Sequence, residues 1–161
     1  MQECLSDTIK PYLNRINAIR TAMTLLEWDN ETGAPKGAAP YTANVQGVLA
    51  AEYQRAVLEP DFVKLVRQLK EDEKGTKAQR ATGRLLDKEI SKLEKIPIEE
   101  YENYNRILAQ AASVWQKAKK ENDYAAFAPY LELIIEYCKK FAALQAKEGQ
   151  KLYDVMLEEF E

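Results

Sequence analysis

The apolar residues of this chain recur every three or four positions, which is the period of an α-helix that packs on one face. In the first such stretch they are Tyr12, Ile16, Ile19, Met23 and Leu26. The strict alternation of a half-buried β-strand does not persist anywhere in the sequence. The pattern therefore predicts an all-α protein: an antiparallel helical array of about six to seven helices, with no sheet, in a single helical domain over residues 1–161.

Prolines and polar residues mark where the first helix starts. Asp7 or Thr8 could cap it, which places Pro11 in the first turn, where a missing N–H does no harm. A start at Gln2 would instead place Pro11 inside the helix and kink it.

Pro40 and the pair Glu59-Pro60 are expected to start the second and third helices. The inward positions of the second are predicted to be Tyr41, Val45, Val48, Leu49, Tyr53 and Ala56. Those of the third are predicted to be Phe62, Leu65, Val66 and Leu69.

A polar run over residues 71–77 is predicted to form a loop. A fourth, heavily charged helix follows over residues 76–95, with Leu86, Ile90 and Leu93 inward. Gly83 costs this helix about 1 kcal/mol relative to Ala, so close packing or a weak point is expected there.

Pro97 is expected to open the fifth helix, with Glu99 and Glu100 at the positive end of its dipole. Its apolar stripe is Tyr101, Tyr104, Leu108, Ala111, Trp115 and Ala118. After a break at Asn122-Asp123, the sixth helix carries two apolar rows. They are Phe127, Leu131, Ile134, Cys138 and Phe141, and Tyr130, Tyr137 and Leu144. A face this wide is expected to need neighbours on two sides. Gly149 is expected to end this helix, and residues 153–160 are predicted to form a last short helix.

The segment LLEWDNETGAPKG, residues 25–37, looks like a site because acids stand beside Trp28 in a Gly/Pro-rich stretch. It fails as a calcium loop, because the sixth position from Asp29 is alanine and the twelfth is Pro40 rather than glutamate. It fails as a phosphate loop, because no Lys followed by Ser or Thr precedes a helix. The structural interpretation is that Trp28 buries its ring at a helix end and that Asp29 and Thr32 satisfy loop N–H groups. Pro35 and Pro40 then stiffen the crossing to the next helix.

Composition excludes several kinds of chemistry. The 161 residues contain no histidine, which removes Ser-His-Asp and Cys-His catalysis and His-based metal sites. A net charge of −3 with interspersed signs predicts no nucleic-acid partner. No apolar run approaches the roughly 20 residues of a membrane span. The N-terminus lacks the features of a signal peptide, so a cytoplasmic location with Cys4 and Cys138 reduced is expected.

Acid pairs such as Glu99-Glu100 are interpreted as solvated residues at helix ends rather than as catalytic dyads, because adjacent helical residues do not face one another.

Two separated motifs resemble one family. The first is Leu-x-Trp-Asp-x-x-Thr-x-x-Pro-x-Gly, at Leu26, Trp28, Asp29, Thr32, Pro35 and Gly37. The second is Asn-Asp-Tyr-x-x-Phe-x-Pro-x-Leu, at Asn122, Asp123, Tyr124, Phe127, Pro129 and Leu131. In this order they are similar to the N-terminal region of the carboxypeptidase Taq family of thermostable metallocarboxypeptidases. The chain departs from the pattern at Ala34, Ala38 and Thr42, where many members have Met, Gly and Arg, which suggests a divergent branch.

The resemblance implies a largely helical enzyme about three times this length, whose zinc ligands and catalytic glutamate follow residue 161. It therefore implies no catalytic, metal or cofactor residue in this chain, and a structural role for the signature residues. Zinc, or a similar divalent metal, is expected in the parent enzyme. The resemblance also implies that this region walls or covers the substrate groove. The partners it implies are the rest of its own chain, a peptide substrate and a second copy in a homodimer.

Three functions compete at this point. The first is an N-terminal fragment of a metallocarboxypeptidase, which is inactive alone and leaves apolar faces uncovered, above all on the sixth helix. The second is a stand-alone helical interaction module that binds partner helices in a groove. The third is an enzyme that uses carboxylates alone, which would hydrolyse its substrate in the presence of chelators.

Overall fold

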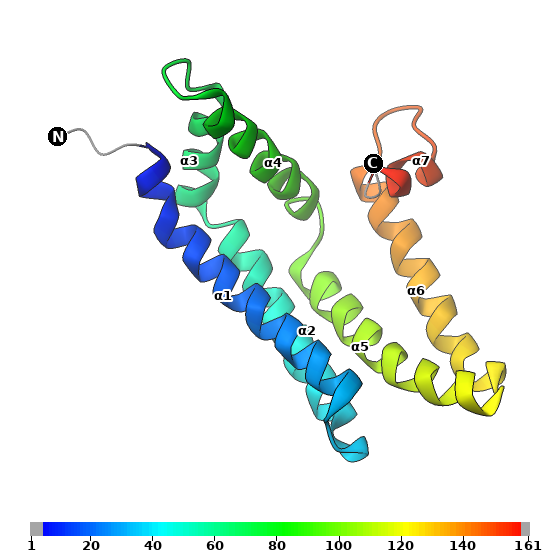
Figure 1. Cartoon of the computed structure of the whole chain (residues 1–161). Helices are drawn as coiled ribbons and strands as arrows, with labels where there is room; N and C mark the ends of the chain where they lie inside the picture. Colours follow the sequence, from blue (N-terminus) through cyan, green and yellow to red (C-terminus); the bar gives the residue numbers. More distant parts are fainter. Residues whose placement is uncertain (1–4, 159–161) are drawn as a thin grey trace.

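The computed structural model describes residues 5–158 as helices joined by short connections (Figure 1). These residues form seven α-helices and a 3-10 turn and contain no strand, so the predicted all-α class is confirmed. The elements are α1 (Leu5–Thr32), η1 (Lys36–Ala38), α2 (Ala39–Val57), α3 (Pro60–Glu71), α4 (Lys77–Leu93), α5 (Ile98–Glu121), α6 (Tyr124–Gln145) and α7 (Leu152–Leu157). The expected thiol Cys4 and the end of the last predicted helix, Phe160, lie outside the described residues.

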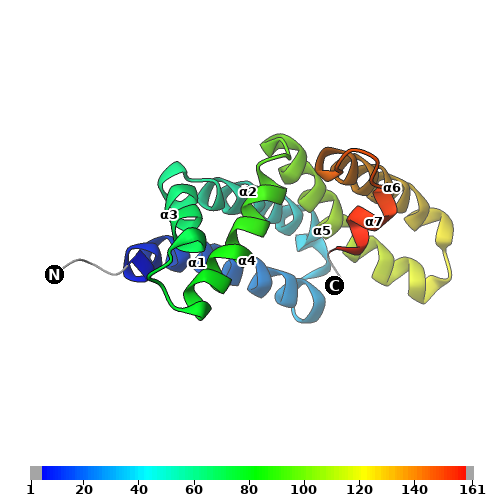
Figure 2. The ribbon, with the colours of Figure 1, turned by 90° about the horizontal axis from the view of Figure 1, so that it is seen from above.

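Neighbouring helices pack as the pairs α1–α2, α3–α4 and α5–α6, and α7 packs on α6. α2 also packs along α5 and so joins the first pair to the last (Figure 1). Seen from above, the array is elongated, with the start of α1 at one end and the α5–α6 connection at the other (Figure 2).

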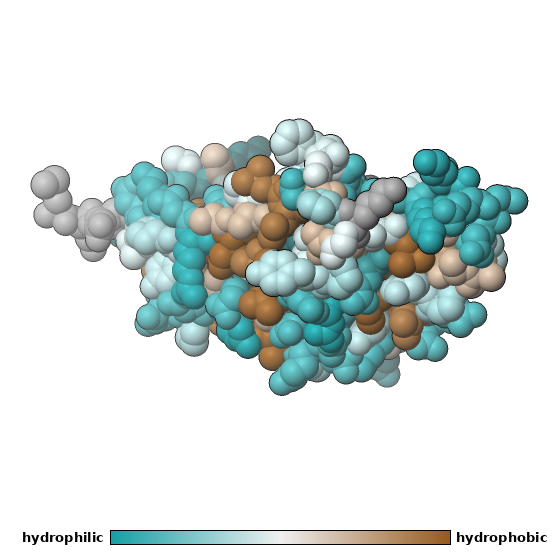
Figure 3. Space-filling view, turned by 90° about the horizontal axis from the view of Figure 1, so that it is seen from below, coloured by the Kyte–Doolittle hydropathy of each residue, from teal (hydrophilic) through white to brown (hydrophobic). Residues whose placement is uncertain are grey.

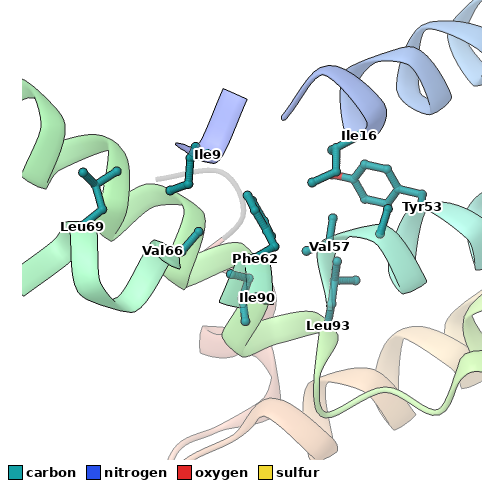
Figure 4. Packing of buried hydrophobic residues seen from close by; sticks show 10 residues of the cluster. Ile9, Ile16, Tyr53, Val57, Phe62, Val66, Leu69, Ile90 and Leu93 are labelled. Atoms are coloured by element: carbon teal, nitrogen blue, oxygen red, sulfur yellow. The ribbon is translucent and has the colours of Figure 1, made fainter. Parts of the chain in front are cut away.

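The main hydrophobic core joins the first four helices (Figure 4). Its buried members are Ile9 and Ile16 of α1, Tyr53, Ala56 and Val57 of α2, Phe62, Val66 and Leu69 of α3, and Ile90 and Leu93 of α4. α5 and α6 meet through a second cluster of aromatic rings. The Phe141 ring lies edge-on to Tyr104 and Tyr137, with ring centroids 5.2 and 5.6 Å apart. The sequence correctly places most of these residues inward because each is a large apolar side chain at helical spacing.

Local capping explains most helix boundaries. The Thr76 side chain accepts a hydrogen bond from Gln79 N–H while the Gln79 side chain accepts from Thr76 N–H, a capping box that starts α4. Asn122 takes the left-handed conformation that ends α5, with a φ of 55°. The Asp123 carboxylate then accepts from Ala126 N–H and starts α6. The predicted breaks at these positions are confirmed.

Two boundary predictions are wrong. α1 already includes Leu5, so Pro11 lies inside the helix and not in its first turn. α6 ends at Gln145 rather than at Gly149, which lies in the following loop with a φ of 77°. Tertiary packing, and not the terminal residue alone, sets how far a helix extends, so a single proline or glycine does not fix where the helix starts or ends.

The predicted inward face of α2 is correct only in part. Tyr53 and Ala56 are buried as expected, but Tyr41 and Val48 are exposed, whereas Ala43, Gly47 and Ala50 are buried. α2 is held between α1 and α5, so small residues face its neighbours and the backbones approach closely. A Cβ at Gly47 would lie 3.2 Å from the Glu102 carbonyl oxygen of α5. Close packing therefore overrides the rule that the larger apolar residues point inward.

The C-terminal helices leave apolar side chains uncovered. Leu133, Ile135 and Leu144 of α6 are each about 40% exposed, and Tyr153 of α7 is 68% exposed. The sixth helix therefore does present uncovered apolar side chains, but not above all others as expected, because Trp28 of α1 and Leu85 of α4 are more exposed than these three α6 side chains. Viewed from below, apolar residues reach the surface in several clusters among polar ones (Figure 3).

An ion-pair cluster joins α3 to α4 around Asp87. Its carboxylate lies 2.8 Å from Lys70 Nζ and 3.4 Å from Arg67 Nε, and Arg67 also contacts Glu94. The hydrogen bond from Lys70 holds the pKa of the Asp87 carboxyl below its usual range, with burial opposing the shift and Arg67 adding to it. The Asp87 side chain is only 16% exposed, so solvent screens this cluster less than an ordinary surface pair.

We expect the substitution Asp87→Asn to change how stability depends on pH. Because its folded pKa is lowered, Asp87 contributes stability that is fully present above its unfolded pKa of about 3.9. That contribution is lost as pH falls through the folded pKa. Urea unfolding should therefore show Asp87→Asn less stable than the wild type at neutral pH, with the two converging as pH falls below about 4. Glu132→Gln, an exposed acid of α6, is the matched control. A difference between wild type and Asp87→Asn that persists unchanged at low pH would contradict this role.

Candidate functional site

The first signature motif forms the end of α1 and not a loop. Trp28, Asp29 and Thr32 all lie within the helix, which ends at Thr32. The Trp28 side chain is 66% exposed, so the expectation that its ring is buried is wrong. Leu25, one turn earlier, is 57% exposed as well, so the described residues do not cover this part of α1.

The polar residues of this motif also act differently from expectation. Gly33 N–H and Ala34 N–H both donate to the backbone carbonyl of Asp29, at 2.9 and 2.8 Å, so the main chain rather than a side chain satisfies them. The Thr32 hydroxyl donates to the Trp28 carbonyl at 2.6 Å inside the helix. Backbone carbonyls at a helix end are free to accept in this way.

Pro35 and Gly37 complete the motif at the crossing to α2. Pro35 precedes η1 with a φ of −58°, the value that its ring fixes. A Cβ at Gly37 would meet nothing within 4 Å, so within this chain no steric contact requires glycine there. Like Trp28, Gly37 is a signature residue to which the described residues give no packing role.

The second motif has a structural role at the junction of α5 and α6. Asp123 caps α6, Phe127 is half-buried, and Pro129 lies inside α6 on an exposed position. The two motifs occupy different helix junctions, α1–α2 and α5–α6, and do not form one site (Figure 1).

A polar cluster that the sequence did not indicate joins α1, α2 and α4. Arg20 donates to the Tyr53 hydroxyl at 2.6 Å, Tyr53 donates to the Glu89 carboxylate, and Arg20 lies 3.4 Å from the same carboxylate. Burial, followed by the hydrogen bond to Glu89, raises the pKa of Tyr53 well above its usual value. The bond to Tyr53 raises the pKa of Arg20 as well. Tyr53 therefore accepts a hydrogen bond from Arg20 and donates one to Glu89.

We expect Tyr53→Phe to lower the free energy of unfolding by about 1 kcal/mol. Hydrogen bonds to charged partners contribute about 1.5–3 kcal/mol. Solvent reduces that figure here, because the Arg20 and Glu89 side chains are 55% and 36% exposed. Chemical denaturation measures the change, and Tyr124→Phe, at a tyrosine 69% exposed, should be neutral. Equal effects of the two substitutions would argue against the cluster as a stabilising contact.

Beside this cluster lies a hollow of about 360 Å³ between α1, α2 and α5. We call it the α1–α2–α5 hollow. Its residues are Arg20, Met23, Thr24, Glu27, Asn30 and Glu31 of α1, Thr42, Ala43, Gln46 and Tyr53 of α2, and Tyr101, Asn105, Leu108, Ala109 and Ala112 of α5. The buried Gln46 side chain donates to the Met23 carbonyl at 2.9 Å and ties the α2 floor to the α1 wall.

The hollow does not fit a metal. Within residues 5–158, no three His, Cys, Asp or Glu side chains are placed to hold an ion, and the whole sequence has no histidine.

The residues of the hollow had only weak signals in the sequence. Arg20 and Tyr53 are 33 positions apart, and Tyr53 and Glu89 are 36 apart, so no local spacing connects them. Tyr53, Tyr101 and Leu108 were placed on inward stripes, and the three-helix contact that brings them together depends on tertiary structure.

Residues 5–158 therefore form an all-α array with a hollow between α1, α2 and α5. Over residues 8–161 it matches the family described as carboxypeptidase Taq (M32) metallopeptidase. The chain belongs to this family, and the resemblance seen in its two motifs is confirmed.

Two curated relatives agree with this assignment. Carboxypeptidase 1 of Bacillus subtilis (strain 168) is 32% identical over 151 residues, which is 92% of this chain and 30% of the relative. Thermostable carboxypeptidase 1 of Pyrococcus furiosus is 31% identical over 159 residues, which is 97% of this chain and 32% of the relative. The chain therefore spans about a third of the length of these relatives.

Solved structures show the same helical arrangement. The BsuCP crystal structure superposes on 98% of this chain with a TM-score of 0.91 at 29% identity, using 32% of its own length. A structure of Pyrococcus furiosus carboxypeptidase covers 98% of this chain with a TM-score of 0.75 at 29% identity, also using 32% of its length. None of the helices described here is long and apolar enough to cross a lipid bilayer.

Proposed function

We propose that this chain is the N-terminal helical region of a metal-dependent carboxypeptidase that removes C-terminal residues from peptides. One observation carries the proposal: the family match runs over residues 8–161, yet the chain spans only 30–32% of the curated carboxypeptidases it resembles. The hydrolytic groups then belong to the other two thirds of the polypeptide. In this proposal the residues of this chain position helices that wall the substrate groove, and the chain alone is inactive.

The metal of the proposed parent enzyme is zinc or a similar divalent ion. Such an ion, when bound, activates water for attack on the peptide bond. This chain's own described residues do not offer ligands for it, so their contribution is packing and groove shape. Assembly as a homodimer and a cytoplasmic location belong to the same proposal and are tested by sedimentation and by cell fractionation of the full-length protein.

A chimera tests the proposal directly. The matched third of Bacillus subtilis Carboxypeptidase 1 is replaced by these 161 residues, and release of C-terminal amino acids from a peptide is measured with and without a chelator. We expect chelator-sensitive release by the chimera and none by the 161-residue chain alone. Hydrolysis by the chain alone, or a chimera without activity, would overturn the proposal.

A stand-alone helical interaction module is the second candidate, because the exposed apolar side chains of α6 and α7, which the fragment proposal also expects, are a surface that a separate partner could cover. It predicts that the 161-residue chain stays monomeric and stable at high concentration until it meets a partner. The fragment proposal predicts concentration-dependent self-association through the same side chains. Analytical ultracentrifugation of the chain and of Leu133→Glu distinguishes the two.

A further inference from the structure

The α1–α2–α5 hollow is lined by amide oxygens that no donor of the described residues uses. Gln46 is 9% exposed, and its Nε2 donates to the Met23 carbonyl at 2.9 Å, whereas its Oε1 accepts no hydrogen bond from residues 5–158. The Asn105 Nδ2 likewise donates to the Tyr101 carbonyl, and the Asn105 Oδ1 accepts nothing from the same residues. Because both nitrogens are bound by carbonyls, the two oxygens are left as acceptors in the lining.

Two carboxylates line the same stretch of the hollow as Gln46. Glu27 and Glu31 are one turn apart on α1, so their side chains are neighbours on one face of the helix. Gln46 is tied to the Met23 carbonyl, which lies one turn before Glu27, so its amide lies near that acid. Neither carboxylate forms an ion pair with a side chain that the structure describes. This stretch therefore offers several acceptors and a net negative charge.

The cation of the lining does not neutralise these acids. Arg20 is bound by Tyr53 and Glu89. Along the axis of α1 its backbone lies about 10 Å from Glu27 and about 16 Å from Glu31. These separations match or exceed the Debye length of about 8–10 Å at physiological salt. A cationic occupant beside Glu27 and Glu31 therefore meets little repulsion from Arg20.

Apolar side chains complete the lining. They include Leu108, Ala109 and Ala112 of α5 and Met23 of α1. The hollow's volume of about 360 Å³ lies near the lower end of the range for small-molecule pockets, which is about 300–1,000 Å³. A mixed lining of this size fits one small molecule that has a polar end and an apolar body.

We propose that the α1–α2–α5 hollow binds a small organic cation, which carries a primary ammonium or guanidinium group on an apolar body. The cationic group donates to the Glu27 and Glu31 carboxylates and to Gln46 Oε1. The apolar body lies on Leu108 and Ala109. An ammonium supplies three donors and no acceptor, which matches a lining of unused acceptors. The inference uses only residues of this chain and does not depend on the proposed function.

Other classes of ligand fit this lining less well. An anion is repelled by the two carboxylates of α1. A neutral molecule of the same shape leaves both carboxylates without a counter-charge. A metal ion needs a closer set of ligands than the described residues bring together. The charge of the lining and its unused acceptors therefore select a cation that also has an apolar part.

An NMR titration of the isotope-labelled 161-residue chain with phenethylammonium chloride tests the proposal. We expect the side-chain amide signals of Gln46 and Asn105 to shift and to saturate, because both amides line the hollow. Phenethyl alcohol has the same ring and chain without the charge and should leave these signals in place. Nα-acetyl-lysine methylamide presents the same ammonium as part of a peptide. The tighter of the two ammonium ligands identifies the source of the cation, a free amine or a basic side chain.

Two variants test the acidic and the apolar parts of the lining separately. The double variant Glu27→Gln, Glu31→Gln should raise the Kd for phenethylammonium by about ten-fold, because two partly exposed ion pairs are lost. The matched control is Glu132→Gln, Glu136→Gln, an exposed pair of acids at the same spacing on α6, which should leave the Kd unchanged. Ala109→Leu fills the hollow and should also raise the Kd, whereas Ala143→Leu, at an exposed alanine of α6, should not.

Three results would overturn the inference. One is equal binding of phenethyl alcohol, which would show that charge does not select the ligand. Another is an equal rise in Kd for the acid pairs of α1 and α6, which would mean that the amine binds acidic surface in general. The third is the same shift of the Gln46 and Asn105 signals with magnesium chloride at equal ionic strength, which would assign the site to a metal ion.

Discussion

Replacing Phe62 with alanine is expected to lower the free energy of unfolding by about 3–5 kcal/mol. Phe62 is 1% exposed and lies in the core that joins the first four helices (Figure 4). Its ring packs on Tyr12 of α1 with centroids 5.7 Å apart. Removing it leaves a cavity in a core that residues of α1, α2 and α4 also line, and a close-packed core collapses only in part. Urea unfolding followed by circular dichroism measures the loss.

Phe127→Ala is the matched control for this prediction. Phe127 is the same residue type in the first turns of α6, but it is half-buried and lies outside the main core. In the 161-residue chain it should cost less than half as much as Phe62→Ala, because part of its surface is already in water. Similar costs at the two positions would mean that the first four helices are not the stable centre of the molecule.

Prolines, polar capping residues and glycines mark where helices start and end, and they made much of the fold predictable. Pro60 and Pro97 stand at the start of α3 and α5, and Thr76 caps α4. These signals act through local backbone chemistry, so one sequence is enough to read them. The inward positions of α3 followed as well, because a short helix with one strong apolar face has a single way to pack.

Helix faces with two neighbours were not predictable in the same way. In α2 the sequence pattern favoured Tyr41 and Val48 as inward residues, whereas Ala43 and Gly47 face the adjacent helices. Trp28 was expected to be buried and is exposed. A pattern of apolar positions shows which residues favour burial, but it does not say whether the covering element lies in the same segment of chain.

The candidate site was harder to predict than the fold for a related reason. The hollow depends on how α1 and α5 both pack on α2, which is a property of three helices together. No motif marks it: the signature residues Trp28 and Asp123 lie at helix junctions, and the cluster of Arg20, Tyr53 and Glu89 spans three helices. The motifs identified the family, while the hollow became visible only in three dimensions.

Gly83→Ala is expected to destabilise the protein by about 2–3 kcal/mol, although alanine is the better helix former by about 1 kcal/mol. Gly83 is buried in α4 against the end of α3. An added Cβ would lie 2.6 Å from the backbone nitrogen of Lys70 and 2.8 Å from its Cα. Both atoms are main chain, so no side-chain rotation relieves the clash, and the two helices must separate. That separation also weakens the Lys70–Asp87 pair beside the contact.

The control for this prediction is Gly37→Ala, where the added Cβ would meet nothing within 4 Å. In the isolated chain, Gly37→Ala should not lower the free energy of unfolding. If its only effect is to restrict the unfolded chain, it should raise that free energy slightly. Thermal unfolding compares the two variants under one set of conditions. If Gly83→Ala proved as stable as the wild type, α3 and α4 would not be in backbone contact at this crossing.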